Sequence, residues 1–262
     1  MEKIKPREQL KLDLPPHWNK WKRPDDLWQT VKRWSDVNYP EHIAWVRSTA
    51  KDAVTPERFW REYVWCSCVA GFNAAVVTGF FDKLMDTIGR DPFKVKPDSL
   101  EAAMRIFGNR RKLNGIYAVA AHLQAIDWVI FSERYFDFGQ LSTAEVIANL
   151  DKLPNVGSII AHHLARNLGF DTVKPDLHLI RVAQRFGFSS PHALCSYLSV
   201  VYDIELLGEV DLRLFLYCQT YGTLELVDRE EVAHGQQGKR ARKAQRPHQA
   251  AGELEVEGIS HA

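Results

Sequence analysis

The chain has 262 residues, of which 45% are hydrophobic and 26% charged, and its formal net charge at pH 7 is +1. This composition excludes a disordered or fibrous chain, and the length suits one large globular domain or two small ones. The balanced charge excludes a strongly basic nucleic-acid-binding protein, so any affinity for DNA must come from a local patch or from backbone groups.

The cysteines and the N-terminus indicate the compartment in which the protein works. Cys66 and Cys68 are closer together than a zinc-binding pair, and the other two cysteines stand alone in apolar runs. We therefore expect reduced, buried thiols and neither a metal site nor an iron–sulfur site. The sequence has no signal-peptide pattern and no run of about 20 apolar residues. These features predict an intracellular, cytoplasmic protein that does not bind membranes.

The N-terminal segment, residues 1–50, is rich in Pro, Lys and Trp, and Leu27, Val31 and Trp34 lie at helical spacing. That spacing predicts a short amphipathic helix over 25–36. Tryptophans interleaved with Lys and Arg fit an arm that follows a DNA backbone or an arm that packs its rings on the main domain. We favour the second interpretation, with the main domain at residues 51–229.

Capping residues mark the ends of a series of predicted helices. Thr55 before a proline starts one helix, and Ser142 with Glu145 forms a capping box at another. Asp98 is expected to cap a further helix, and Gly169 to end one. The apolar periodicity predicts helices over 59–70, 74–88, 110–125, 143–153, 158–168, 177–186, 191–201 and 210–221. No alternating strand pattern is found, so the predicted fold is all-α.

From about residue 230 the chain is poor in apolar residues, with a basic block at 239–243 and an acidic stretch at 253–257. Such a segment cannot bury enough surface to order itself, so we expect a disordered charged tail over 230–262. Its basic block would either add non-specific DNA affinity by counterion release or act only as a solubilising terminus.

The connection at Leu153–Gly157, Leu-Pro-Asn-Val-Gly, carries the strongest functional signal. A tight hairpin needs residues that tolerate positive φ, and Asn155 and Gly157 supply them. The turn would leave the first amides of the next helix unpaired, and such amides suit a phosphate oxygen. This predicts DNA binding without lysines, although a plain connection between two helices would look similar.

Asp176 is the second signal. An aspartate after proline and before a helix is most often only an N-cap. Asp176, however, stands nineteen residues after Gly157, at the far end of the second hairpin helix. A carboxylate at that place could reach the sugar of a nucleotide whose neighbouring phosphates the hairpin holds.

Together, the hairpin and the aspartate resemble the helix-hairpin-helix DNA glycosylase superfamily, specifically its endonuclease III-like branch. The family pattern is a Leu-Pro-Gly-Val-Gly hairpin, a helix, and Val-Asp-Thr-His before another helix; residues 153–157 and 175–178 correspond to its two parts. Three further segments are similar to its Asn-x-x-Lys-Ala segment, its closing helix, and its first long helix with the following loop: 107–116, 210–217 and 59–73. The resemblance covers roughly residues 55–228.

The resemblance implies a two-lobed all-α fold that flips the target nucleotide into a pocket between its lobes. It also implies that Asp176 stabilises the positive charge developing on the sugar as the N-glycosidic bond breaks, and that it orients water. The expected DNA contacts are Asn155, Val156, Gly157, Ile159, Lys174 and Arg181. The expected base-pocket residues are Tyr63, Trp65, Phe72, Asn73 and Tyr117, with Phe72 and Asn73 in the loop that enters the duplex.

Three departures from the family pattern refine this expectation. Bifunctional members carry a lysine two residues after the last hairpin glycine, which forms a Schiff base with the sugar; here Ile159 stands there, so we expect hydrolysis by water alone. The family's C-terminal four-cysteine cluster is absent, and Asn155 replaces a hairpin glycine. No cofactor is expected apart from a monovalent cation at the hairpin. The expected partner is double-stranded DNA, bound by a monomer.

Three classes of function remain open on the sequence. The first is a monofunctional DNA glycosylase of base excision repair. The second is a phage-type enzyme that transfers a group onto a thymine derivative in DNA, for which the extra aromatic residues and the missing lysine leave room. The third is a DNA-binding module without catalysis, and the placement of Asp176 argues against it.

Overall fold

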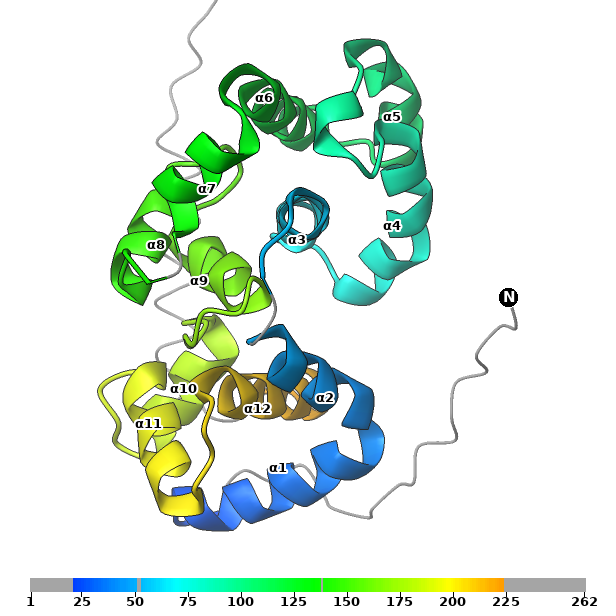
Figure 1. Cartoon of the computed structure of the whole chain (residues 1–262). Coiled ribbons are helices and arrows are strands. Elements are labelled where there is room, and N and C mark those ends of the chain that lie inside the picture. Colours follow the sequence, from blue (N-terminus) through cyan, green and yellow to red (C-terminus); the bar gives the residue numbers. More distant parts are fainter. Residues whose placement is uncertain (1–20, 51–52, 138, 224–262) are drawn as a thin grey trace, which may run out of the picture. The chain divides into compact units, whose positions relative to one another are not determined.

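The structure is a computed structural model of the chain and describes residues 21–50, 53–137 and 139–223. These residues form α-helices and two short 3-10 helices and contain no strand, so the all-α prediction is confirmed. Figure 1 labels most of the helices. In chain order the elements are α1 (Pro24–Asn38), α2 (Pro40–Thr49), α3 (Pro56–Val69), α4 (Ala74–Ile88), η2 (Pro92–Lys94), η3 (Pro97–Ser99), α5 (Leu100–Ile106), α6 (Arg110–Ile126), α7 (Trp128–Phe136), α8 (Thr143–Leu150), α9 (Ser158–Asn167), α10 (Leu177–Arg185), α11 (Pro191–Tyr202) and α12 (Leu207–Tyr221).

Local capping starts and ends several helices where the sequence predicts. The Thr55 hydroxyl accepts a hydrogen bond at the start of α3, and Ser142 and Glu145 form both halves of the capping box of α8. Asn73 caps α4, which spans the predicted residues. Gly169, with φ +99°, lies just beyond the end of α9, as expected of a left-handed residue that stops a helix. Each of these signals acts within one turn of chain, which is why the sequence reveals it.

One expectation about a helix start is wrong. Asp98 lies inside the 3-10 turn η3, and its side chain caps no helix; the N-cap position of α5 is Ser99. The 3-10 turn that Pro97 begins therefore places the start of α5 one residue later than a cap at Asp98 would. Helices α2 and α7 were not predicted from the sequence. The start of α7 follows Asp127, a residue with φ +69° whose carboxylate caps the helix, and one positive-φ residue leaves no mark in apolar periodicity.

Helices α3 to α9 pack around one hydrophobic core. The side chains of Phe59, Trp60 and Tyr63 on α3 are fully buried in it, and α3 contacts α4, α6 and α9. Burying a large apolar side chain contributes about 1.5–3 kcal/mol. The aromatic face of α3 is therefore a main source of stability for this part of the protein.

Helices α1, α2, α10, α11 and α12 form a second group around α12, which contacts each of the others. Figure 1 shows the first two helices beside the last one, although they are far apart in sequence. Trp28 and Trp34 of α1 are buried, and Trp34 meets Tyr217 of α12 edge to face with ring centroids 5.3 Å apart. Residues 1–20 and the predicted tail at 230–262 lie outside the described residues.

The two groups of helices are joined by the α9–α10 connection and by polar contacts beside it. Arg166 of α9 forms a buried ion pair with Asp211 of α12. Within the connection, the Asp171 carboxylate accepts a hydrogen bond from the Gly208 amide at 3.0 Å. The Cβ of any residue replacing Gly169 would lie 2.5 Å from the Thr49 backbone oxygen, so α2 passes close to this connection. The α9–α10 connection is therefore held at Gly169 and at Asp171 by contacts with α2 and α12.

Two negative findings apply to the described part of the chain. No single helix there is long and apolar enough to cross a bilayer; α6 and α7 meet that test only when joined across a bend of 117°. No group of three or more His, Cys, Asp or Glu side chains in the same residues is arranged to hold a metal ion.

Candidate functional site

The hairpin between α8 and α9 reverses direction at Asn155, which has φ +63°. The Val156 amide donates to the Leu153 oxygen at 3.1 Å and closes the turn. Gly157 has φ −114° and ψ 174°, an extended conformation open to any residue. The expectation of positive φ therefore holds for Asn155 and is wrong for Gly157. The reason is that Gly157 already serves as the N-cap of α9, a position that takes extended backbone.

The start of α9 presents backbone amides without a side-chain cap. Gly157 supplies no capping group, and among the described residues no side chain accepts from the amides of the first turn. Gly157 and Ser158 are exposed, and Ile159 is 44% exposed. Unpaired amides at a helix start, with the helix dipole behind them, form a site that favours an anion.

Asp176 lies at the end of the α9–α10 connection and caps α10. Its Oδ1 accepts from the amides of His178 and Leu179 at 3.0 and 3.1 Å. Oδ2 makes no hydrogen bond with the described residues, and the nearest cation is the Lys174 ammonium at 3.8 Å. The side chain is 13% exposed, so it is neither sealed in the core nor fully in solvent. One oxygen fixes the carboxylate, and the other stays available to a substrate.

Lys174, His178 and Arg181, which lie near Asp176 in the sequence, make different contacts. The Lys174 ammonium lies over the ring of Phe215 at 5.1 Å, and its side chain is 15% exposed. The His178 Nδ1 is 2.8 Å from the Thr223 hydroxyl, and Arg181 donates to the same hydroxyl at 3.3 Å. His178 and Arg181 therefore tie α10 to the end of α12. Only Lys174 also stands next to the carboxylate.

Three of the predicted base-pocket aromatics face other parts of the protein. Tyr63 has no exposed surface, and its hydroxyl donates to the Pro154 oxygen at 2.8 Å. Tyr63 therefore stabilises the hairpin from the protein interior, and its ring is not accessible to a base. Trp65 packs edge to face on a phenylalanine of α4. The Tyr117 hydroxyl is 2.6 Å from that of Ser99, on the 3-10 turn η3. The structure does not bring these three rings together.

The other two predicted pocket residues lie in the short α3–α4 loop. Phe72 is 45% exposed, and its ring meets Phe107 edge to face at 5.4 Å. The Asn73 side chain accepts from the Ala75 amide and caps α4, so its Oδ1 already has a hydrogen-bond partner within the protein. Phe72 is thus an exposed aromatic ring with a defined position.

Polar side chains behind Asp176 were not singled out by the sequence. Arg166 and Asp211 pair there, and Asn167 donates to Glu62 at 2.8 Å. Burial and nearby cations hold the pKa of His163 well below its ordinary value, which leaves the imidazole neutral. All five residues are buried. A polar or charged residue on the apolar face of a predicted helix is the only sequence signal that could have marked them.

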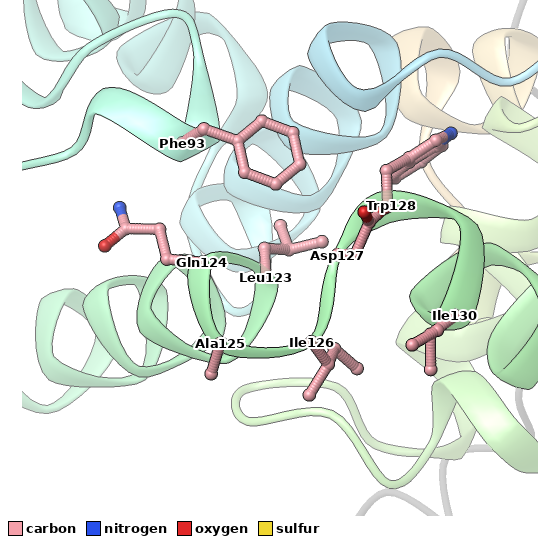
Figure 2. A pocket seen from close by; sticks show the side chains of 8 residues that line it. All are labelled: Phe93, Leu123, Gln124, Ala125, Ile126, Asp127, Trp128 and Ile130. Carbon is pink, nitrogen blue, oxygen red and sulfur yellow. The ribbon is translucent and has the colours of Figure 1, made fainter.

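A shallow hollow of about 840 Å³ lies elsewhere, between η2 and the junction of α6 with α7. Figure 2 shows Phe93 and Trp128 on opposite sides of it, with Leu123 and Asp127 between them. Its lining includes none of the residues predicted for the active site. The hollow therefore adds nothing to the chemistry of Asp176.

Comparisons with known proteins identify the fold. No protein-family model matches the chain, and no curated relative matches its sequence. Solved structures do match. The 8-oxoguanine DNA glycosylase of Thermotoga maritima aligns with a TM-score of 0.51 at 15% identity, over 74% of this chain and 96% of that one.

Two structures from Methanocaldococcus jannaschii match as well. The 8-oxoguanine DNA glycosylase has a TM-score of 0.51 at 17% identity, over 80% of this chain and all of that one. The 8-oxoguanine glycosylase/lyase in complex with a 15mer DNA containing 8-oxoguanine has a TM-score of 0.50 at 17% identity, over 76% and 99%. All three are helical enzymes matched over nearly their whole length. The chain therefore has the all-helical fold of these 8-oxoguanine DNA glycosylases.

Proposed function

We propose that this protein is a DNA glycosylase that releases a damaged or modified base from duplex DNA by hydrolysing its N-glycosidic bond. The observation that carries the proposal is the hydrogen bonding of the Asp176 carboxylate. Its Oδ1 is anchored by two backbone amides, while Oδ2 has no hydrogen bond among the described residues. This is the arrangement that a carboxylate needs to act on a sugar without moving.

In the proposed reaction the base leaves with the bonding electrons, and positive charge develops at C1′ and the ring oxygen of the deoxyribose. The Asp176 carboxylate stabilises this charge and orients a water molecule, whose oxygen forms the new bond to C1′. The proton of that water passes to the carboxylate or to solvent, and the departing base takes up a proton.

The hairpin would hold the strand that carries the target nucleotide. The uncapped amides at the start of α9 supply the donors for a phosphate. Gly157 supports this role in a second way. Its extended backbone suits any residue, and a Cβ there would meet no atom within 4 Å. Neither a left-handed backbone nor internal packing requires glycine here, so the missing side chain leaves room for the close approach of a molecule outside the protein.

The finer features of the function follow from the substitution at the lysine position of bifunctional enzymes. Ile159 has no nucleophile, so we propose a monofunctional enzyme of base excision repair without Schiff-base chemistry. We propose that it works inside the cell as a monomer on double-stranded DNA, with Lys174 and Arg181 near the phosphates. No cofactor takes part, and a monovalent cation at the hairpin is the one ion compatible with this proposal.

The proposed function is tested with a panel of duplexes that carry alkylated, deaminated and oxidised bases, 8-oxoguanine among them. We expect release of at least one free base, scored by chromatography, with no strand cleavage until alkali is added. Cleavage without alkali would contradict the monofunctional proposal. Release of no base from any duplex would contradict the glycosylase proposal, and a group transferred onto a thymine derivative would favour the phage-type alternative instead.

A substitution at Gly157 separates DNA binding from stability. In Gly157→Ala the methyl group should obstruct the phosphate and weaken duplex affinity about tenfold, because a hydrogen bond to a charged group contributes about 1.5–3 kcal/mol. The free energy of unfolding should stay within about 1 kcal/mol of the wild type. Fluorescence anisotropy and thermal unfolding provide the two measurements.

Gly79→Ala is the matched control, since a Cβ at this exposed glycine of α4 also meets nothing within 4 Å. It should leave duplex affinity unchanged. If both variants bind DNA as the wild type does, the hairpin is not the phosphate-binding element.

A further inference from the structure

Lys112 of α6 contacts the ends of two segments that the proposed function assigns to DNA. Its side chain is 6% exposed and reaches the C-terminal end of α3, where Nζ donates to the Ser67 oxygen at 2.7 Å and to the Ala70 oxygen. Its own backbone oxygen accepts from the Asn155 Nδ2 at 2.8 Å. One residue is thus bonded to the root of the α3–α4 loop and to the tip of the hairpin.

The loop contact extends to the exposed ring of Phe72. The Lys112 ammonium lies 4.8 Å from the centroid of that ring and 6.0 Å from the centroid of Phe107. A cation over an aromatic face contributes about 0.5–2 kcal/mol, the larger values applying where water is excluded. Gly71, with φ +75°, turns the chain between α3 and this ring. The ammonium therefore fixes a ring that no other charged group of the described residues holds.

The hairpin contact depends on a glycine of α6. A Cβ at Gly115 would lie 2.7 Å from the Cγ of Asn155, so the absence of a side chain there admits the asparagine. Tyr63 adds a second link, because its hydroxyl lies 3.1 Å from the Gly115 oxygen and 2.8 Å from the Pro154 oxygen. The left-handed residue of the hairpin is therefore seated on α6 next to Lys112.

Burying the Lys112 ammonium costs free energy that the packing of its side chain does not by itself explain. Its polar contacts are backbone oxygens and ring faces, and no carboxylate among the described residues pairs with it. Burial lowers its pKa below the ordinary lysine value. An apolar side chain of similar length would fill the same space without the desolvation cost. Its position at the C-terminal end of α3 offsets part of that cost, since the helix dipole favours a cation there.

We propose that Lys112 is a positioning residue that couples the phosphate-binding hairpin to the loop carrying Phe72. When the hairpin binds the DNA strand, the Phe72 ring is then already positioned to fill the space that the flipped base leaves. This inference rests on the proposed function. It makes the α6 segment from Lys112 to Gly115 a rigid bridge between two DNA-contacting elements. A residue that only capped α3 would stabilise the loop without any link to the hairpin.

The coupling is tested first without DNA, by amide hydrogen exchange in the full-length protein. Asn155→Gly keeps the left-handed backbone and removes the bond to Lys112. We expect exchange to rise about fivefold or more at residues 70–73 as well as in the hairpin. Asn149→Ala is the matched control. Asn149 lies on α8, next to the hairpin, and its side-chain amide also donates to a backbone oxygen, that of Arg134 on α7, at 3.0 Å. A rise confined to residues 153–158, or an equal rise at 70–73 in the control, would overturn the proposal.

The second test measures base extrusion with a duplex that carries 2-aminopurine beside the target nucleotide. Lys112→Met should slow the fluorescence rise about tenfold while duplex affinity stays within about twofold, and Lys112→Arg should restore part of the rate. In a Phe72→Leu background the methionine substitution should add nothing further. Equal losses of affinity and extrusion rate in Lys112→Met would refute the coupling. If that variant does not fold, the exchange experiment decides alone, and it does so whether or not the protein releases bases.

Discussion

Asp176→Asn should abolish base release while the protein still folds and binds duplex DNA. The amide oxygen of asparagine can accept from His178 and Leu179 as Oδ1 does now, and asparagine caps helices as well as aspartate does. What is lost is the negative charge that the proposed reaction needs beside the sugar. Removing such a group from a transition state costs about 2.7–4 kcal/mol, so single-turnover base release should fall about a hundredfold or more.

Asp171→Asn is the matched control for this prediction. Asp171 lies in the same connection and accepts a hydrogen bond from the Gly208 amide, which an asparagine oxygen can also do. Its base-release rate should stay within a few-fold of the wild type. Duplex affinity of Asp176→Asn should equal or exceed that of the wild type, because one carboxylate no longer repels phosphates. A rate for Asp176→Asn close to that of Asp171→Asn would remove Asp176 from the mechanism.

Breaking the buried ion pair between Arg166 and Asp211 should produce a large loss of stability. Arg166 and Asp211 are both almost fully buried, and burial raises the pKa of Asp211 while the Arg166 guanidinium opposes that shift. Arg166→Met would leave the Asp211 carboxylate in the interior without its partner. Such a change costs about 3–5 kcal/mol, which for a domain of this size lowers the Tm by roughly 10 °C.

Two comparisons make the measurement specific. Arg90→Met removes an exposed arginine that pairs with Asp86, and should change the free energy of unfolding by less than about 1 kcal/mol. The double variant Arg166→Met/Asp211→Leu replaces both buried charges with apolar groups and should regain most of the lost stability. If the single variant at Arg166 is as stable as the variant at Arg90, the pair does not hold the two helix groups together.

The sequence determined the features that depend on a few neighbouring residues. Thr55 and Ser142 stand at helix starts because each side chain accepts from an amide three residues ahead. The order of the hairpin, a helix and Asp176 at the start of the next helix is also readable, because it lies within one short stretch. These local signals predicted the all-α fold and the two elements on which the proposed chemistry depends.

The tertiary structure decided what depends on contacts between distant segments. The hydrogen bond from Tyr63 to the hairpin is visible only in the tertiary structure. The same holds for the bond between Asn155 and Lys112, which links the hairpin to the residue that contacts the α3–α4 loop. The pairing of Arg166 with Asp211 likewise spans two helix groups. A lysine or arginine in an apolar stretch signals that a partner exists, but the partner is chosen by how the helices pack, which periodicity along one chain segment does not encode.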